Sequence, residues 1–350
     1  MKFDGLAICY FVDVGFGTCQ VVYLGEGRAL VIDAGPPLGK KKNILQQILR
    51  KCGVDRIEAL VVSHNDRDHL GNAITIFNQY KGNIGKIAYL QDGWGRRSED
   101  TYQHWRSSIR QAITEGHLSR DSVRRLETTS VESTSLYSNG ATNAEDKVDL
   151  KLLYPDFITA SEASEQDNHN EACAILVLEV GSCRIFFSGD APLGAWHLIH
   201  RDCGGATITA DVMSMPHHGG EIGGTSEDLQ KLYSKIVRPS WVVVSVGQHD
   251  RYRLPNGESI SAAIESGAKL VCTQMTPKCY GDSIQYPFNF PGNPGSGQNT
   301  DPVRTCGGTV QFSVYKDHVV MDSPNFEDHR KRISKLEHPL CMLNTVQSKK

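Results

Sequence analysis

The chain has 350 residues, of which 39% are hydrophobic and 22% charged, a composition typical of globular proteins rather than of disordered, collagenous or coiled-coil chains. A formal net charge of -3 excludes a general positive field for coating nucleic acid, so any such contact has to come from a local patch. No apolar run approaches the about 18 residues of a membrane helix, and the N-terminus lacks a signal-peptide pattern. Ten cysteines are too few for a disulfide scaffold. We therefore expect a soluble protein of a reducing cytoplasm without a membrane partner.

Strand and helix signals alternate in the first half of the chain. They predict, in order, strands at 19–24 and 29–33 joined by a hairpin turn, a helix within 40–52, a buried strand at 57–63 and a helix through Ile74 and Phe77. The following polar stretch, residues 95–148, is helical at first and then rich in Ser, Thr and Asn. Such a composition predicts an insertion or lid.

Apolar runs of strand length dominate the second half. They predict strands at 149–154, 174–180, 184–188, 210–215, 241–246 and 269–273, a helix at 258–266 and a closing hairpin within 308–321. Prolines and glycines are concentrated at 280–305, which predicts an irregular loop. We expect one domain over residues 1–325 and a basic C-terminal tail over 326–350.

The most informative segment directly follows the predicted strand at 57–63. It has the spacing H-x-D-x-D-H, formed by His64, Asp66, Asp68 and His69. Imidazole nitrogens and carboxylate oxygens suit zinc, manganese or iron, and burying four such groups without a metal would be costly. A metal site is therefore favoured over a solvated acidic loop that contains two incidental histidines.

Acidic or imidazole side chains also end three other predicted strands. These are Asp190, which could bridge two metals, the pair His217 and His218, and Asp33, which could orient a ligand imidazole. Taken singly, each has an ordinary alternative as a turn residue or a surface histidine pair. Four strand ends that each deliver an acid or an imidazole favour one common site.

The order of these motifs resembles the metallo-β-lactamase superfamily, in which histidine usually stands at the position of Asp66. The variant is most similar to the ComEC-like branch, the metallo-hydrolase domains related to the competence DNA-uptake protein. Further matches extend the resemblance over about residues 8–320, at residues 11–18, at Asn170 ahead of the strand that begins near Cys173, and at 244–247 and 252–255. The family has a histidine where this chain has Leu254, and the resemblance does not extend to DNA uptake.

The resemblance implies an α+β fold, the αββα sandwich of two mixed β-sheets flanked by helices, with the metals at one edge. It assigns His64 and Asp66 to one metal and Asp68 and His69 to the second, with Asp190 bridging. His218 is the favoured further ligand of the second metal and His217 the alternative. The position of Asn170 corresponds to the third motif of the superfamily, and Asp33 lies behind the ligands. The predicted catalytic residues are Asp68, His217 and Asn170, with His217 stabilising the transition state.

Two divalent ions are expected as cofactors, with Zn²⁺ favoured and Mn²⁺ the alternative. A hydroxide held between them would attack a phosphodiester bond of a nucleic acid or a nucleotide. One alternative is the hydrolysis of small-molecule esters, lactones or amides. The other is a non-catalytic, metal-binding subunit of a multi-protein defence or signalling system, which would have protein partners.

Side chains outside these motifs are weaker candidates. Arginines that could contact phosphate, and that are as readily explained as surface residues, are Arg67, Arg96, Arg97, Arg251 and Arg253. Trp94 and Trp105 could stack on bases, although core packing is favoured. Cys272, Cys279 and Cys306 flank the 280–305 loop and could hold a structural Zn²⁺, with buried free thiols as the favoured alternative.

Overall fold

The computed structural model describes residues 5–38, 43–91, 99–128, 133–165, 169–247, 252–280, 306–322, 333 and 339–342. Within these residues the strands form two sheets, each with parallel and antiparallel neighbours. The first sheet contains, in spatial order, β15 (Val319–Met321), β14 (Val310–Val314), β1 (Ala7–Phe11), β2 (Cys19–Gly25), β3 (Arg28–Ala34), β4 (Arg56–Val62), β5 (Ile84–Tyr89) and β6 (Val123–Arg125). The second contains β13 (Lys269–Cys272), β12 (Val237–Val244), β11 (Ile208–Ser214), β10 (Cys183–Phe187), β9 (Ile175–Val180), β8 (Val148–Tyr154) and β7 (Thr134–Ser138).

Helices connect the strands and cover the sheets. The α-helices are α1 (Ile44–Lys51), α2 (Arg67–Leu70), α3 (Ala73–Gln79), α4 (Glu99–Thr114), α5 (Phe157–Glu165), α6 (Leu193–Asp202), α7 (Ser226–Lys231), α8 (Gly257–Glu265) and α9 (Pro277–Tyr280). Shorter helical turns are η1 (Arg120–Ser122), η2 (Ala144–Asp146), η3 (His169–Ala172), η4 (Pro216–Gly219), η5 (Leu232–Ile236) and η6 (Leu340–Met342). None of the described helices combines the length and the apolar character needed to cross a membrane.

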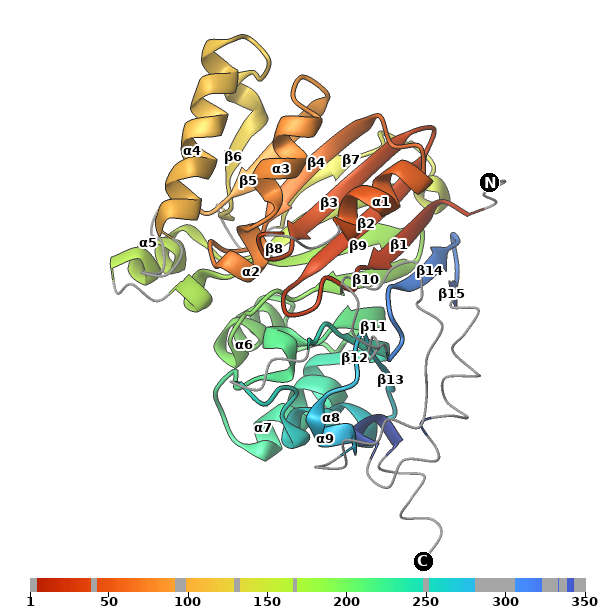
Figure 1. Ribbon diagram of the computed structural model, residues 1–350. Coiled ribbons are helices and arrows are strands. Elements are labelled where there is room, and N and C mark those ends of the chain that lie inside the picture. Colours follow the sequence, from red (N-terminus) through yellow and green to blue (C-terminus); the bar gives the residue numbers. More distant parts are fainter. Residues whose placement is uncertain are drawn as a thin grey trace, which may run out of the picture.

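Three apolar layers hold the sheets and helices together. Side chains alternate along β1, so that Cys9 and Phe11 join the layer between the sheets while Ile8 and Tyr10 join the layer under the helices. In Figure 1, α1, α3 and α4 cover the outer face of the first sheet, and α6, α7 and α8 cover that of the second. This arrangement confirms the predicted αββα sandwich of two mixed sheets flanked by helices.

The predicted strands occur where the apolar runs are, and their ends differ. The largest difference is in β12, which begins at Val237, ahead of the predicted start at Trp241. Residues 237–240 alternate buried and exposed side chains and pair with β11. The exposed Arg238 and Ser240 interrupt the apolar run, so a search for apolar runs does not detect this part of the strand.

Residues 95–148 contribute to the sandwich itself. Trp105 in α4 is 0% exposed and packs against Phe77 and Tyr89, which confirms the favoured interpretation of core packing for Trp105 and excludes the alternative of base stacking. From the same stretch, β6 and β7 form edge strands of the two sheets. The insertion or lid stays a prediction. Trp94, residues 281–305 of the predicted loop and most of the predicted tail lie outside the described residues.

A buried hydrogen bond links segments that are distant in the sequence. Gln274 Nε2, just after β13, donates to Asp13 Oδ1, just after β1, at 2.7 Å, and the backbone N–H of Gly15 donates to the same oxygen at 3.2 Å. Burial raises the pKa of Asp13 from 3.8 to about 7, although these two donors act in the opposite direction.

Asp13→Asn is expected to flatten the pH dependence of stability. An acid with a raised folded-state pKa keeps its proton in the folded protein, so its contribution to stability is lost as pH rises from about 4 to about 7. Chemical denaturation at pH 5 and pH 8 should show the unfolding free energy of the wild type falling by roughly 2 to 3 kcal/mol more than that of the variant. Parallel pH profiles would contradict this assignment.

Candidate metal centre

The candidate ligands gather at one edge of the sandwich because their strands end there. Asp33 is near the end of β3, and β4, parallel to β3, is followed by the turn that begins at Ser63 and His64. In the second sheet β10 and β11 are also parallel, and they lead into Asp190 and into η4, which contains both His217 and His218. Each predicted ligand thus comes from the carboxyl end of a strand.

One group of four side chains is gathered most closely. The ligand atoms of Asp68, His69, Asp190 and His218 all lie within 4.8 Å of one another. Among the described residues, no other cluster of three or more His, Cys, Asp or Glu side chains is as close. His218 Nε2 lies 3.2 Å from Asp68 Oδ2, and His69 Nε2 lies 3.2 Å from Asp190 Oδ1. His218 therefore belongs to this group and His217 does not, and the choice of His218 as the ligand stays a prediction.

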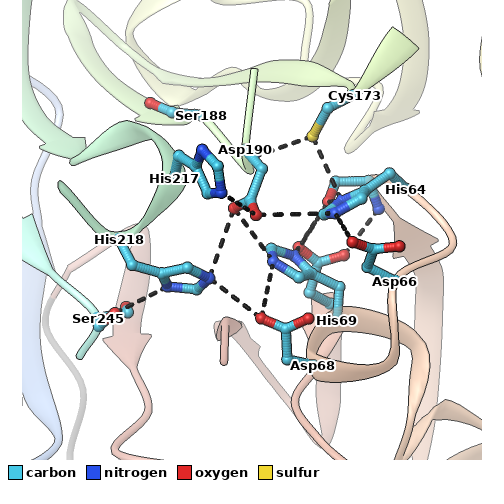
Figure 2. A network of polar contacts seen from close by, with 12 residues as sticks. His64, Asp66, Asp68, His69, Cys173, Ser188, Asp190, His217, His218 and Ser245 are labelled. Atoms are coloured by element: carbon cyan, nitrogen blue, oxygen red, sulfur yellow. Dashed lines mark hydrogen bonds and ion pairs between the residues drawn. The ribbon is translucent and has the colours of Figure 1, made fainter. Parts of the chain in front are cut away.

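The second carboxylate oxygen of Asp190 faces a different set of residues. Asp190 Oδ2 lies 3.8 Å from His64 Nε2 and 3.7 Å from His217 Nε2. His64 Nε2 in turn lies 3.8 Å from Asp66 Oδ2. Figure 2 shows Asp190 between the imidazoles, one oxygen toward each set. A carboxylate in this position can bridge two cations.

Hydrogen bonds orient the imidazoles. In each ring the Nδ1 atom contacts an anchor and the Nε2 atom faces the centre of the site. The anchors are Asp33 Oδ2 for His69 (2.7 Å), the Ser245 carbonyl for His218 (2.8 Å), the Glu221 carbonyl for His217 (2.8 Å), and Ser63 Oγ (3.2 Å) and Cys173 Sγ (3.4 Å) for His64. Such outer partners fix both the direction and the tautomer of a metal-binding imidazole.

Asp33, which contacts His69, is itself held in position by Ser63. Its carboxylate accepts hydrogen bonds from the backbone N–H of Ser63 at 2.7 Å and from Ser63 Oγ at 2.8 Å. All three side chains are buried. Asp33 thus links Ser63 to the imidazole of His69, and its role in orienting a metal ligand stays a prediction.

Opposite charges offset the cost of burying the carboxylates. Burial alone would raise the pKa of Asp68, but His69 and His218 hold that pKa at about 2, and the same two imidazoles hold the pKa of Asp190 well below its ordinary value. Conversely, burial would lower the pKa of His69, but Asp190 and Asp33 raise it well above its ordinary value. The carboxylates are thus anionic at neutral pH and attract positive charge into the site.

The buried atoms at the centre suit a metal. Within the described residues His64 Nε2, His69 Nε2, His218 Nε2 and Asp190 Oδ1 are buried and lie within ion-pair distance of opposite partners, but none of them forms a hydrogen bond. Leaving such atoms unsatisfied is costly, whereas imidazole nitrogen and carboxylate oxygen are ligands of divalent metals such as zinc. The donor set therefore points to divalent metal ions.

Cys173, which the sequence motifs do not single out as a site residue, contacts two candidate ligands at once. Its Sγ contacts His64 Nδ1 and accepts a hydrogen bond from the backbone N–H of Asp190 at 3.0 Å. A Cβ at Gly189, where φ is +48°, would lie 2.5 Å from that sulfur, so the turn requires glycine. The sequence signal was the position of Cys173 at the start of an apolar run close to the third-motif position.

Asn170 and three cysteines are the other residues that the sequence singles out. Asn170 is half-buried in η3, where its carbonyl accepts a hydrogen bond from the backbone N–H of Cys173, and its catalytic role stays a prediction. Cys272, Cys279 and Cys306 are buried, and the first and last are hydrogen bonded to each other. These three sulfur atoms are not gathered as closely as the ligand group, and zinc binding there also stays a prediction.

A cavity of about 360 Å³ lies elsewhere, between α5 and α6. Its lining includes Tyr154, Phe157 and Leu198 and contains none of the candidate metal ligands. The cavity is therefore separate from the metal centre.

Comparisons with known proteins agree with this architecture. The family model of the metallo-beta-lactamase superfamily matches residues 12–221. ComE operon protein 3 of Bacillus subtilis (strain 168) is 20% identical over 292 residues, which cover 79% of this chain and 32% of that protein, so the chain spans about a third of the length of this curated relative. Among similar solved structures, the metallo-beta-lactamase fold protein YhfI of Bacillus subtilis is 10% identical, and the match covers 77% of this chain and 96% of that chain with a TM-score of 0.41. The short form of human tRNase Z is 13% identical, and the match covers 69% of this chain and 93% of that chain with a TM-score of 0.40.

Asp33→Asn is expected to weaken zinc binding by about 10- to 100-fold. The amide keeps an acceptor for Ser63 but presents N–H₂ where His69 needs an acceptor, so the ring loses its orientation. Chelator competition measures the affinity, and circular dichroism checks the fold.

The matched control is Asp211→Asn, because Asp211 likewise accepts a backbone N–H bond, from Arg184 at 2.8 Å, but lies outside the site. The control should bind zinc like the wild type. Equal affinities for all three proteins would contradict the orienting role of Asp33.

Proposed function

The chain belongs to the metallo-β-lactamase superfamily, and from this premise we propose that it hydrolyses phosphodiester bonds, in a nucleic acid or a nucleotide, with the help of two divalent metal ions. The observation that carries the proposal is the position of Asp190, whose two oxygens face two separate sets of ligand atoms. Paired cations bridged in this way suit the displacement at phosphorus, because they stabilise both the attacking and the leaving oxygen.

The distances support two ligand sets. Asp68, His69 and His218 would hold one ion with Asp190 Oδ1. His64 and Asp66 would hold the other with Asp190 Oδ2. When bound, the ions supply a hydroxide at neutral pH and draw charge from the phosphoryl oxygens. The carboxylate of Asp66, in place of the usual imidazole, is a hard ligand that favours Mn²⁺ as an alternative to Zn²⁺.

The exposure of His217 supports a role on the substrate. Its side chain is 33% exposed, whereas those of His64, His69 and His218 are buried. Its Nδ1 donates to the Glu221 carbonyl, and its Nε2 lies 3.7 Å from Asp190 Oδ2. In the imidazolium form, which carries a proton on both ring nitrogens, Nε2–H would donate a hydrogen bond to a phosphoryl oxygen as negative charge develops there.

Arg67 favours a phosphodiester over a small ester or lactone. It lies in the sequence between the candidate ligands Asp66 and Asp68, is exposed and can contact a phosphate. A cytoplasmic location and protein partners in a multi-gene system stay predictions.

Asp68→Asn is expected to lower metal-dependent phosphodiester cleavage by at least about 100-fold, which corresponds to the loss of roughly 3 kcal/mol of transition-state stabilisation. Single-stranded DNA and bis(4-nitrophenyl) phosphate, each with Zn²⁺ or Mn²⁺, are the substrates. The variant Asp211→Asn should cleave both at the wild-type rate.

Three results would contradict the proposal. Cleavage that survives Asp68→Asn would place the activity outside this site. Hydrolysis of lactones or esters without phosphodiester cleavage would support the small-molecule alternative. Stoichiometric metal binding without any turnover would support a metal-binding subunit.

A further inference from the structure

An aromatic pair extends from the metal centre to the surface. The ring centroid of Phe16 lies 5.2 Å from that of the His218 imidazole. The ring of Tyr252 is stacked on that of Phe16, with 5.4 Å between the ring centroids and an interplanar angle of 15°. Tyr252 is 46% exposed and is one of four large hydrophobic side chains exposed among the described residues. A half-exposed ring thus lies one aromatic side chain away from a candidate metal ligand.

Backbone contacts hold this pair in place. The N–H of Asn256 donates to the carbonyl of Gly219, directly after the ligand His218, at 2.6 Å. Pro255 packs so closely there that a Cβ on Gly219, at φ +76°, would lie 2.7 Å from the Cβ of Pro255. On the other side the backbone of Phe16 lies against Gly247, where a Cβ would be 2.3 Å from the Phe16 nitrogen. These contacts hold the backbone of Phe16 and the segment that follows Tyr252 close to the candidate metal ligands.

Positive charge adjoins the exposed ring. Arg253 follows Tyr252 and is exposed, and the ammonium group of Lys278 donates to the Pro255 carbonyl at 2.9 Å. Burial, and then the nearby Arg253, lower the pKa of Lys278, which indicates that the two cations lie near each other. An aromatic face beside cations is the combination that binds single-stranded nucleic acid, because bases stack on the ring and phosphates contact the charges.

We propose that Tyr252, supported by Phe16, is a stacking platform for an unpaired base of single-stranded nucleic acid, and that Arg253 and Lys278 contact a phosphate of the same strand. The platform rests on the proposed function, since it specifies the substrate whose phosphodiester lies at the metal centre. A single strand is required because the bases of a duplex are stacked on both faces and do not present one to a protein ring. A stacked base should contribute about tenfold or more in affinity.

The test compares two labelled single strands of equal length, an oligothymidylate and a matched strand of abasic sites. Their binding to the zinc-loaded full-length chain is measured by fluorescence anisotropy before cleavage proceeds, and their cleavage is followed separately. The wild type should bind the base-bearing strand about tenfold more tightly. Tyr252→Ala should abolish this preference without changing the affinity for the abasic strand, and Tyr252→Phe should retain it.

Two further variants complete the design. Phe157→Ala removes another exposed aromatic ring, 56% exposed and outside the metal centre, and should keep the preference for bases. The double variant Arg253→Gln, Lys278→Gln should weaken the binding of both strands alike and reduce its salt dependence.

The outcomes separate this inference from the proposed function. Equal binding of the two strands by the wild type, or a base preference that survives Tyr252→Ala, overturns the platform even when DNA is cleaved. A base preference that depends on Tyr252 in a protein without cleavage supports the platform and contradicts the proposed function.

Discussion

The structure depends on the burial of one carboxylate, Asp190, against imidazoles that face it from two sides. Buried charge is costly unless it is neutralised, and the ring nitrogens at the centre of the site satisfy no hydrogen bond within the described residues. Divalent cations would remove both costs, since they neutralise the carboxylates and accept the nitrogen lone pairs. The surrounding residues, among them Asp33 and Cys173, then serve to hold the ligand atoms in position.

The fold makes this concentration of charge feasible because each ligand comes from the end of a strand that is fixed on both faces. The apolar layer between the sheets sets the position of β3 and β4 relative to β10 and β11. Tight glycine turns then aim the side chains, as at Gly189, where only the absence of a Cβ leaves room for Cys173. Precision at the site therefore comes from the rigid sandwich and not from the short helical turns that carry the ligands.

The sequence predicts those features of the fold and of the candidate site that depend on residues close together in the chain. The apolar runs mark the strands, and the acid and imidazole residues stand at their ends, so the candidate ligands could be named from the motif and from the resemblance it carries. Contacts between distant segments leave no such pattern. The stacking of Phe16 on Tyr252 and the bond from Gln274 to Asp13 join residues from opposite ends of the chain, and neither periodicity nor spacing indicates them. The contacts of Trp105 with Phe77 and Tyr89 also join distant segments, because they depend on how α4 packs on the first sheet.

Anomalous X-ray scattering at the zinc edge, from crystals of the zinc-loaded protein, tests whether Asp190 bridges two cations. We expect two strong peaks roughly 3.5 to 4 Å apart, one on each side of the Asp190 carboxylate. The first should lie among Asp68, His69 and His218, and the second beside His64 and Asp66. A single peak, or peaks that leave Asp190 without a metal, would show that Asp190 is not a bridging ligand.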